Sequence, residues 1–179
     1  SLKPRTSSVW NEKTYKVNER MTALSYEAHV KYTGRHFTFA AKSLLASCLD
    51  HTALIGGYGI SSIDPDNGEQ EYTPFWHSTS WINFTCGTKW KGHFFAGYTK
   101  NLGTADVLVS ATVYGMGLDI DQVFSTNIAF SYNLPHWQIG MEYMPTTAWY
   151  GDTDKVSGKT VNTHSVTNHR ILGLVMYYF

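Results

Sequence analysis

Alternation of apolar and polar side chains, with a period of two residues, dominates this chain. It begins near Met21 and is clearest from Val123 to Leu134. The even positions of that segment carry Phe124, Thr126, Ile128, Phe130, Tyr132 and Leu134. Successive side chains of a β-strand point to opposite faces, so this period predicts two-faced strands. The segments have no helical period, and we therefore expect an all-β fold.

The last ten residues, Arg170 to Phe179, follow the same pattern and end on an aromatic ring. Terminal residues of soluble domains are usually poorly anchored and exposed, which makes a bare apolar strand unusual there. A strand that meets lipid instead needs an apolar residue at every second position and an aromatic residue at the membrane boundary. The ending therefore favours a lipid-facing strand.

Composition excludes some classes of protein but does not decide between a membrane barrel and a soluble β-sandwich. The 179 residues suit one domain, and 14 basic residues balance 14 acidic ones, so no nucleic-acid partner is expected. Mean hydropathy is −0.26, and no run approaches the roughly 20 apolar residues of a spanning helix. Aromatic residues reach 15%, enough for two membrane-interface girdles. Composition alone favours a tyrosine-rich soluble β-sandwich.

The pattern predicts about eight strands of roughly 9–12 residues, a length that crosses a tilted bilayer span. They lie near 24–32, 37–42, 54–60, 81–86, 93–99, 123–134 and 137–143 and after 163, with a possible short strand at 107–113 inside a long loop. Short turns are expected near Asp50, Lys89 and Pro135, and longer loops near Asp66, Asp106 and Asp154. The tight turn at 34–35 breaks this alternation. Counting strands back from the C-terminus puts the N-terminus on the short-turn side.

We divide the chain into a polar N-terminal segment, 1–20, and an antiparallel β-barrel, 21–179. The start, Ser1-Leu2-Lys3, has no apolar core of a signal peptide. Either a signal has been removed or this is a piece of a longer chain, and the abrupt start favours a piece. The barrel is then either the C-terminal half of a larger one or a small barrel that closes alone and is filled by side chains.

Residues that could carry chemistry form no recognised catalytic or metal pattern. Cys48 and Cys86 lie 38 positions apart and are interpreted as small apolar strand residues. The eight histidines show no zinc spacing, and no Gly-x-Ser-x-Gly elbow appears, so we predict no enzymatic activity, no metal and no cofactor. The loop 64–69 partly matches a calcium loop, but its glycine is misplaced and a solvated turn is the preferred interpretation.

Several segments resemble the C-terminal half of large porin-like outer-membrane barrels of the Bacteroides group. They are 24–33, 41–47, 56–59, 95–103 and the closing strand, and the resemblance covers 21–179. It implies a location in the outer membrane of a Gram-negative bacterium, with membrane lipid as a partner. It also implies that the barrel assembly machinery reads the ending, in which Tyr177 and Phe179 would be the signal. Homo-oligomers are common among such proteins, although one sequence shows no interface.

We therefore expect a channel for passive diffusion of small hydrophilic solutes, with polar strand faces turned to the lumen. The candidate lumen residues are Glu27, His29, Lys31, Lys42, His93, Glu142 and Arg170, with Asn83 and Gln138 beside them. The same residues fit the solvated face of a soluble sheet. Two alternatives stay open: a non-conducting structural or adhesive outer-membrane barrel, and a soluble β-barrel that binds an apolar ligand.

Overall fold

The computed structural model describes all residues except 1–2, 5–6, 17 and 50–54, and this part of the chain forms strands and no helices. The strands are β1 (Ser7–Trp10), β2 (Lys13–Lys16), β3 (Ser25–Thr33), β4 (Phe37–Ser47), β5 (Gly56–Ile63), β6 (Gln70–Gly87), β7 (Trp90–Thr104), β8 (Val113–Met116), β9 (Ile120–Asn133), β10 (Trp137–Thr153) and β11 (Thr160–Tyr177).

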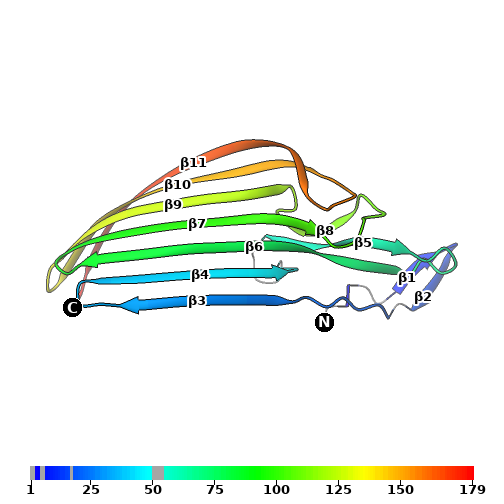
Figure 1. Ribbon diagram of the computed structural model, residues 1–179, viewed down its shortest axis with the longest axis horizontal. Coiled ribbons are helices and arrows are strands. Elements are labelled where there is room, and N and C mark those ends of the chain that lie inside the picture. Colours follow the sequence, from blue (N-terminus) through cyan, green and yellow to red (C-terminus); the bar gives the residue numbers. More distant parts are fainter. Residues whose placement is uncertain (1–2, 5–6, 17, 50–54) are drawn as a thin grey trace.

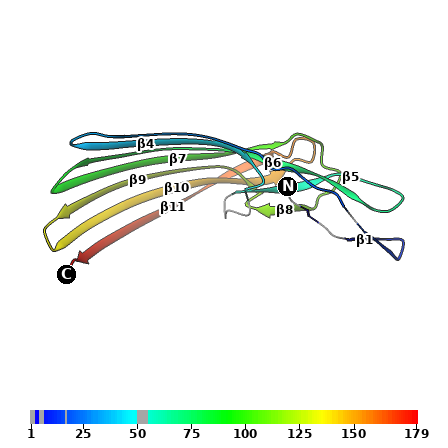
Figure 2. The same ribbon diagram turned by 90° about the horizontal axis from the view of Figure 1, so that it is seen from below.

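Seven of these strands form one antiparallel sheet in the order β11-β10-β9-β7-β6-β4-β3 (Figure 1). The sheet is arched and open (Figure 2). Its edge strands, β3 and β11, each have a single neighbour within the described residues. The prediction of an antiparallel all-β fold is confirmed. Closure of these strands alone into a barrel is wrong, because β3 and β11 stay apart.

The sequence predicted about eight strands in the wall, and the main sheet has seven. The difference comes from the strand expected near 54–60. Its described part is β5, which lies off the main sheet and pairs with the first half of β6 and with β8. Gly57 lies opposite Gly115 of β8, and a Cβ on Gly57 would collide with the Tyr114 carbonyl oxygen. The glycines therefore allow the backbones of β5 and β8 to approach closely. Leu54, which was expected in this strand, lies outside the described residues.

The two ends of the sheet differ in their connections. At one end, which we call the turn end, tight turns join β3 to β4, β6 to β7 and β9 to β10, and the C-terminus lies there too (Figure 1). At the other, the loop end, lie the longer connections 48–69, 105–119 and 154–159. The turn at Gly34-Arg35 is thus no exception to the alternation. The turn expected near Asp50 falls outside the described residues.

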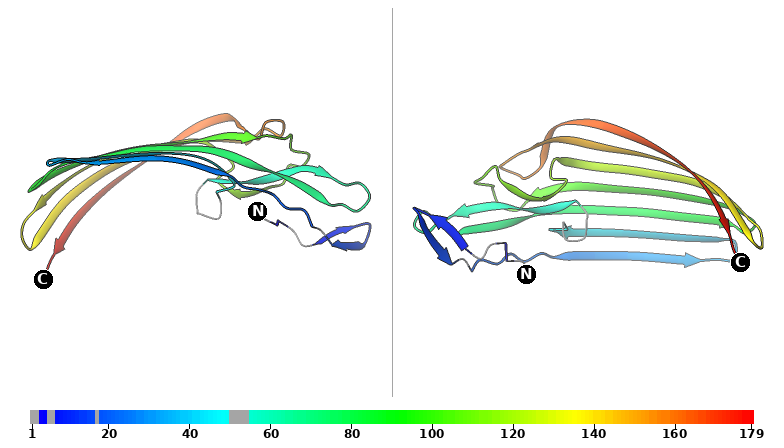
Figure 3. Two further views of the ribbon diagram at one scale, coloured as in Figure 1. Left: turned by 60° about the horizontal axis from the view of Figure 1, so that its bottom comes forward. Right: turned by 180° about the vertical axis from the view of Figure 1, so that it is seen from behind.

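The N-terminal part lies at the loop end, where Figure 3 shows its hairpin in dark blue. The prediction that it starts on the short-turn side is wrong, because counting β5 as a wall strand reversed the parity. The polar segment 1–20 contains a hairpin of β1 and β2. Its turn residues, Asn11 and Glu12, both have positive φ, at 47° and 62°, as a two-residue hairpin turn requires.

A small apolar core lies at the loop end. Phe75 of β6 is fully buried against Leu108 and Leu118, and Val113 of β8 packs against them. The short strand expected at 107–113 is misplaced: the strand of this connection is β8, which begins only at Val113. The long connection between β7 and β9 therefore packs on the sheet here.

Candidate functional site

The cross-strand register sorts the side chains of all seven strands onto two faces. Val30 pairs with Ala41, and Ala41 pairs with Ile82 on the next strand, so the apolar positions of neighbouring strands coincide. We call this side the apolar face. Its exposed members include Val30, Tyr32, Ile82, Phe84, Phe94, Ile128, Phe130, Ile139, Met141, Ile171 and Val175.

The opposite side, the polar face, is the more sheltered of the two. On β10, Ile139 and Met141 are 50% and 65% exposed, whereas Gln138 and Glu142 beside them are only partly exposed. Phe75 belongs to the polar face by register, and the loop-end connections cover it. These connections lie under the concave side of the arch (Figure 2), so the polar face is concave. Soluble proteins bury large apolar side chains, and this sheet does the reverse.

A charged cluster lies on the polar face of β3 and β4. The Lys42 ammonium is 2.8 Å from the Glu27 carboxylate, and His29 Nδ1 is 3.2 Å from the other oxygen of that carboxylate. His29 pairs with Lys42 in the register, and Glu27, two residues before His29 on the same face of β3, is diagonal to Lys42. Glu27 thus joins two neighbouring strands at one edge of the sheet.

A second ion pair lies near the opposite edge, on β10 and β11. The Arg170 guanidinium donates to Glu142 Oε1 at 2.6 Å. Arg170 is directly opposite Met144, so this contact is also diagonal. The side chains are 53% and 25% exposed, so water can reach both.

Hydroxyl and aromatic side chains occupy the polar face between these clusters. Thr79 and Thr99 share a hydrogen bond of 3.1 Å, and Ser125 and Thr146 share one of 2.8 Å. The rings of Trp81 and Phe95 lie 6.3 Å apart. The middle of the concave surface is therefore uncharged but hydrogen-bonding.

All seven candidate residues from the sequence lie on the polar face. Glu27, His29 and Lys42 come together, as do Glu142 and Arg170. His93 instead contacts the Thr85 hydroxyl, at 3.1 Å. Lys31, in the same strand as Glu27, has no ion pair among the described residues. The sequence pattern placed these residues on one face but could not show which of them pair.

The turn end of the apolar face carries a row of aromatic rings, one from each of the seven strands. We call these residues the aromatic row: Tyr32, Phe37, Phe84, Trp90, Tyr132, Trp137 and Tyr177. Four neighbouring pairs of the row are in ring contact, among them Trp90 and Tyr132, with centroids 4.4 Å apart, and Trp137 and Tyr177, with centroids 4.7 Å apart. Phe179 lies beyond β11, exposed, with its ring 5.1 Å from Tyr177.

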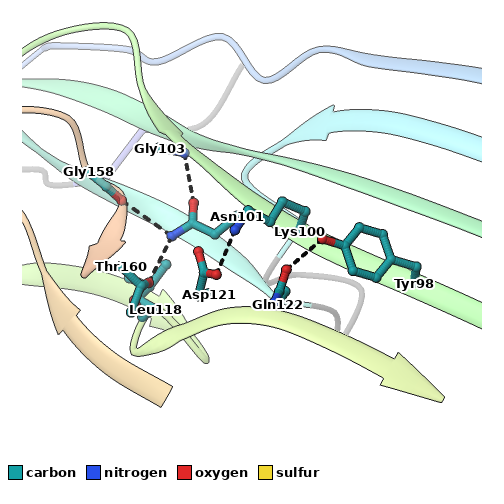
Figure 4. Close-up of polar contacts among 9 residues, drawn as sticks. All are labelled: Tyr98, Lys100, Asn101, Gly103, Leu118, Asp121, Gln122, Gly158 and Thr160. Carbon is teal, nitrogen blue, oxygen red and sulfur yellow. Dashed lines mark hydrogen bonds and ion pairs between the residues drawn. The ribbon is translucent and has the colours of Figure 1, made fainter. Parts of the chain in front are cut away.

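A buried amide, which the sequence did not single out, holds the loop end together (Figure 4). Asn101 Nδ2 donates to the Gly158 carbonyl and to Thr160 Oγ1, each at 3.3 Å. Asn101 Oδ1 accepts from the Gly103 amide at 2.8 Å. Asn101 is 2% exposed, so these bonds join β7 to the β10–β11 loop away from water. The one local signal is Asn-x-Gly, which is typical of an Asx turn.

Two loops at this end share one geometry. The Gly68 amide donates to the Asp64 carbonyl at 2.9 Å, and Gly158 donates to that of Asp154 at 2.8 Å. Asp154 Oδ2 accepts from both the amide and the hydroxyl of Ser157, and these hydrogen bonds, chiefly that from the side chain, lower the pKa of the Asp154 carboxyl. In the 64–69 loop, Asp64 Oδ1 accepts from the Asp66 amide. The carboxylates therefore serve the turns.

No group of three or more histidine, cysteine, aspartate or glutamate side chains is placed to bind a metal within the described residues. Cys48 and Cys86 form no disulfide bond; Cys86 lies in β6 and Cys48 just after β4. The part of the chain that the structure describes holds no helix long and apolar enough to cross a membrane.

Comparison with known proteins gives no relative. No family model, no curated protein and no solved structure matches the chain. The functional conclusion therefore depends on the two faces of the sheet and on the residues that they carry.

Proposed function

We propose that this chain forms part of the wall of a bacterial outer-membrane β-barrel that lets small hydrophilic solutes diffuse through its lumen. One observation carries the proposal: the exposed convex face is apolar, and the sheltered concave face is polar. A barrel wall in lipid has this arrangement, with an apolar outer band and a polar interior. The aromatic row would then lie at one membrane interface.

The open edges fit a wall that further strands complete. Backbone groups in lipid must be hydrogen-bonded, so β3 and β11 each need a second neighbour there. Both strands run from the loop end to the turn end, because an odd number of antiparallel strands lies in the path. An entirely antiparallel closure therefore requires an odd number of additional strands between them.

The polar face would line the lumen. Its cations, Lys31, Lys42, Lys91 and Arg170, outnumber its carboxylates, Glu27 and Glu142. The two carboxylates are already paired, with Lys42 and with Arg170. Fixed charges in a narrow lumen set ion preference through the local field. We therefore expect a weak preference for anions.

The face polarity also separates the proposal from one of its two rivals, the soluble calyx. A soluble calyx for an apolar ligand lines its concave side with apolar residues, and here the concave side holds the ion pairs and hydroxyl groups. A non-conducting barrel would share the same faces and differs only in its lumen. The exposed Phe179 at the turn end stays a proposed signal for the assembly machinery.

Reconstitution of the full chain tests the proposal. We expect the protein to need detergent or lipid for solubility and to produce stepwise conductance in a planar bilayer. Membrane insertion without conductance would favour the structural barrel. A monodisperse protein in detergent-free buffer would contradict the proposal.

A further inference from the structure

Charge is distributed unequally between the two ends of this electrically balanced chain. The turn end consists of 33–37, 87–91, 133–137 and 177–179. It carries Arg35, Lys89 and Lys91 together with two histidines, His36 and His136, and it has no aspartate or glutamate side chain. Arg35 and Lys89 are exposed. The turn end is therefore a cationic rim.

The connections at the loop end have the opposite character. The described carboxylates at this end, in the connections, the adjoining strand ends and the N-terminal segment, are Glu12, Glu19, Asp64, Asp66, Glu69, Glu71, Asp106, Asp119, Asp121, Asp152 and Asp154. Fewer cations accompany them, namely Lys3, Lys13, Lys16, Arg20, Lys100, Lys155 and Lys159, and Lys100 is held by Asp121 at 2.6 Å. The zero net charge thus hides a separation of charge along the strands.

Hydrogen bonds tie the cationic turns into one surface. The Gly87 amide donates to the His36 carbonyl at 3.0 Å, and the Asn133 amide donates to that of Lys89 at 2.8 Å. The Tyr178 amide donates to the His136 carbonyl, also at 2.8 Å. Each turn is therefore fixed to the next, and the rim runs along the whole turn end of the sheet.

The rim is continuous with the aromatic row. Lys89 Nζ lies 5.2 Å from the centroid of the Tyr132 ring, whose other neighbour is Trp90. On the β9–β10 turn, the His136 ring lies 6.3 Å from that of Tyr177. Cationic groups, aromatic rings and the apolar face thus follow one another along the strands. A membrane surface has the matching order of phosphate, interface and hydrocarbon.

We propose that the turn end docks onto the headgroups of an anionic phospholipid leaflet, with Arg35 and Lys89 facing the phosphates. This inference rests on the proposed membrane function and adds the lipid class and the side of the membrane. Each lysine or arginine near an anionic leaflet contributes about 1 kcal/mol, or roughly fivefold in affinity. An acidic protein or a nucleic acid would not require the adjoining apolar face.

The test compares vesicles of phosphatidylcholine with vesicles that also contain phosphatidylglycerol. The full chain is diluted from urea into each, and the bound fraction is measured by flotation at low and high salt. The turn-end variant is Arg35→Glu with Lys89→Glu. The matched loop-end control is Lys155→Glu with Lys159→Glu, which reverses the same number of exposed charges.

We expect the native chain to prefer phosphatidylglycerol vesicles, and we expect salt to weaken that preference. In the turn-end variant the preference for phosphatidylglycerol vesicles should be at least about tenfold smaller, and in the loop-end control it should be unchanged. Neutral variants, Arg35→Gln with Lys89→Gln, give a smaller loss in the same direction and serve if the reversed pair does not fold. Equal binding to both vesicles, or an equal loss in the control, would overturn the lipid preference alone. Binding to neither vesicle would contradict the membrane function itself.

Discussion

Arg170 on β11 donates to the carboxylate of Glu142 on β10 across 2.6 Å, on the polar face of the sheet. The contact is diagonal and both side chains reach solvent, so it contributes only about 0–1 kcal/mol to stability. Such a pair is better suited to shaping the field over the polar face than to holding the strands together. Lys42 and Glu27 have the same relationship at the other edge.

The first prediction concerns these two cations. Replacing Lys42 and Arg170 by Glu makes the polar face net negative and removes the lysine partner of Glu27 and the arginine partner of Glu142. The reversal potential under a salt gradient should therefore move toward cation preference. Planar-bilayer recording measures it, and Lys155→Glu at the loop end is the control. An unchanged reversal potential would argue against a lumen position for Lys42 and Arg170.

The second prediction concerns the buried amide. Asn101→Ala removes three hydrogen bonds and leaves the Gly103 amide and the Gly158 carbonyl without that partner. Each buried group left unpaired costs about 1–3 kcal/mol, so the β10–β11 loop should open. Limited proteolysis near 154–159 should become faster. Asn83→Ala, on the more open part of the polar face, should leave the cleavage rate unchanged.

The third prediction is a pH dependence. Hydrogen bonds from Ser157 lower the pKa of the Asp154 carboxyl, so folding of the loop favours the carboxylate. A lowered folded-state pKa gives stability that is present at neutral pH and is lost as the pH falls through that pKa. An NMR titration of the carboxyl carbon should show a midpoint below the usual aspartate range. Ser157→Ala should return the midpoint toward that range; a midpoint equal in both proteins would count against the loop geometry.

Period-two alternation predicted the wall strands well because it is a local property of the backbone. The segment 123–134 became β9, and the polar residues Glu27, Lys42 and Arg170 lie on one face as expected. The lengths of the strands were harder to predict from the sequence than their positions. The strand expected near 81–86 is only the second half of β6, which begins at Gln70 and includes Pro74, the partner of Tyr58 in β5.

The pairing of strands that are distant in the sequence could not be predicted, for a physical reason. Alternation identifies β5 as a strand but carries no information on its neighbour, which is set by segments as distant as β8. That one error produced the wrong strand count and put the N-terminus on the wrong side. Likewise, the Asn101–Gly103 turn is visible locally, whereas its partner Gly158 lies 57 positions away.

The most direct test of the central claim compares two adjacent positions of β10. Spin labels are placed at Met141, on the apolar face, and at Glu142, on the polar face, and the protein is reconstituted in lipid. If the apolar face meets hydrocarbon, the label at 141 should collide mainly with oxygen, and the label at 142 with a water-soluble nickel chelate. A label at 141 that is shielded from both reagents, in a protein that stays monodisperse in plain buffer, would contradict the claim.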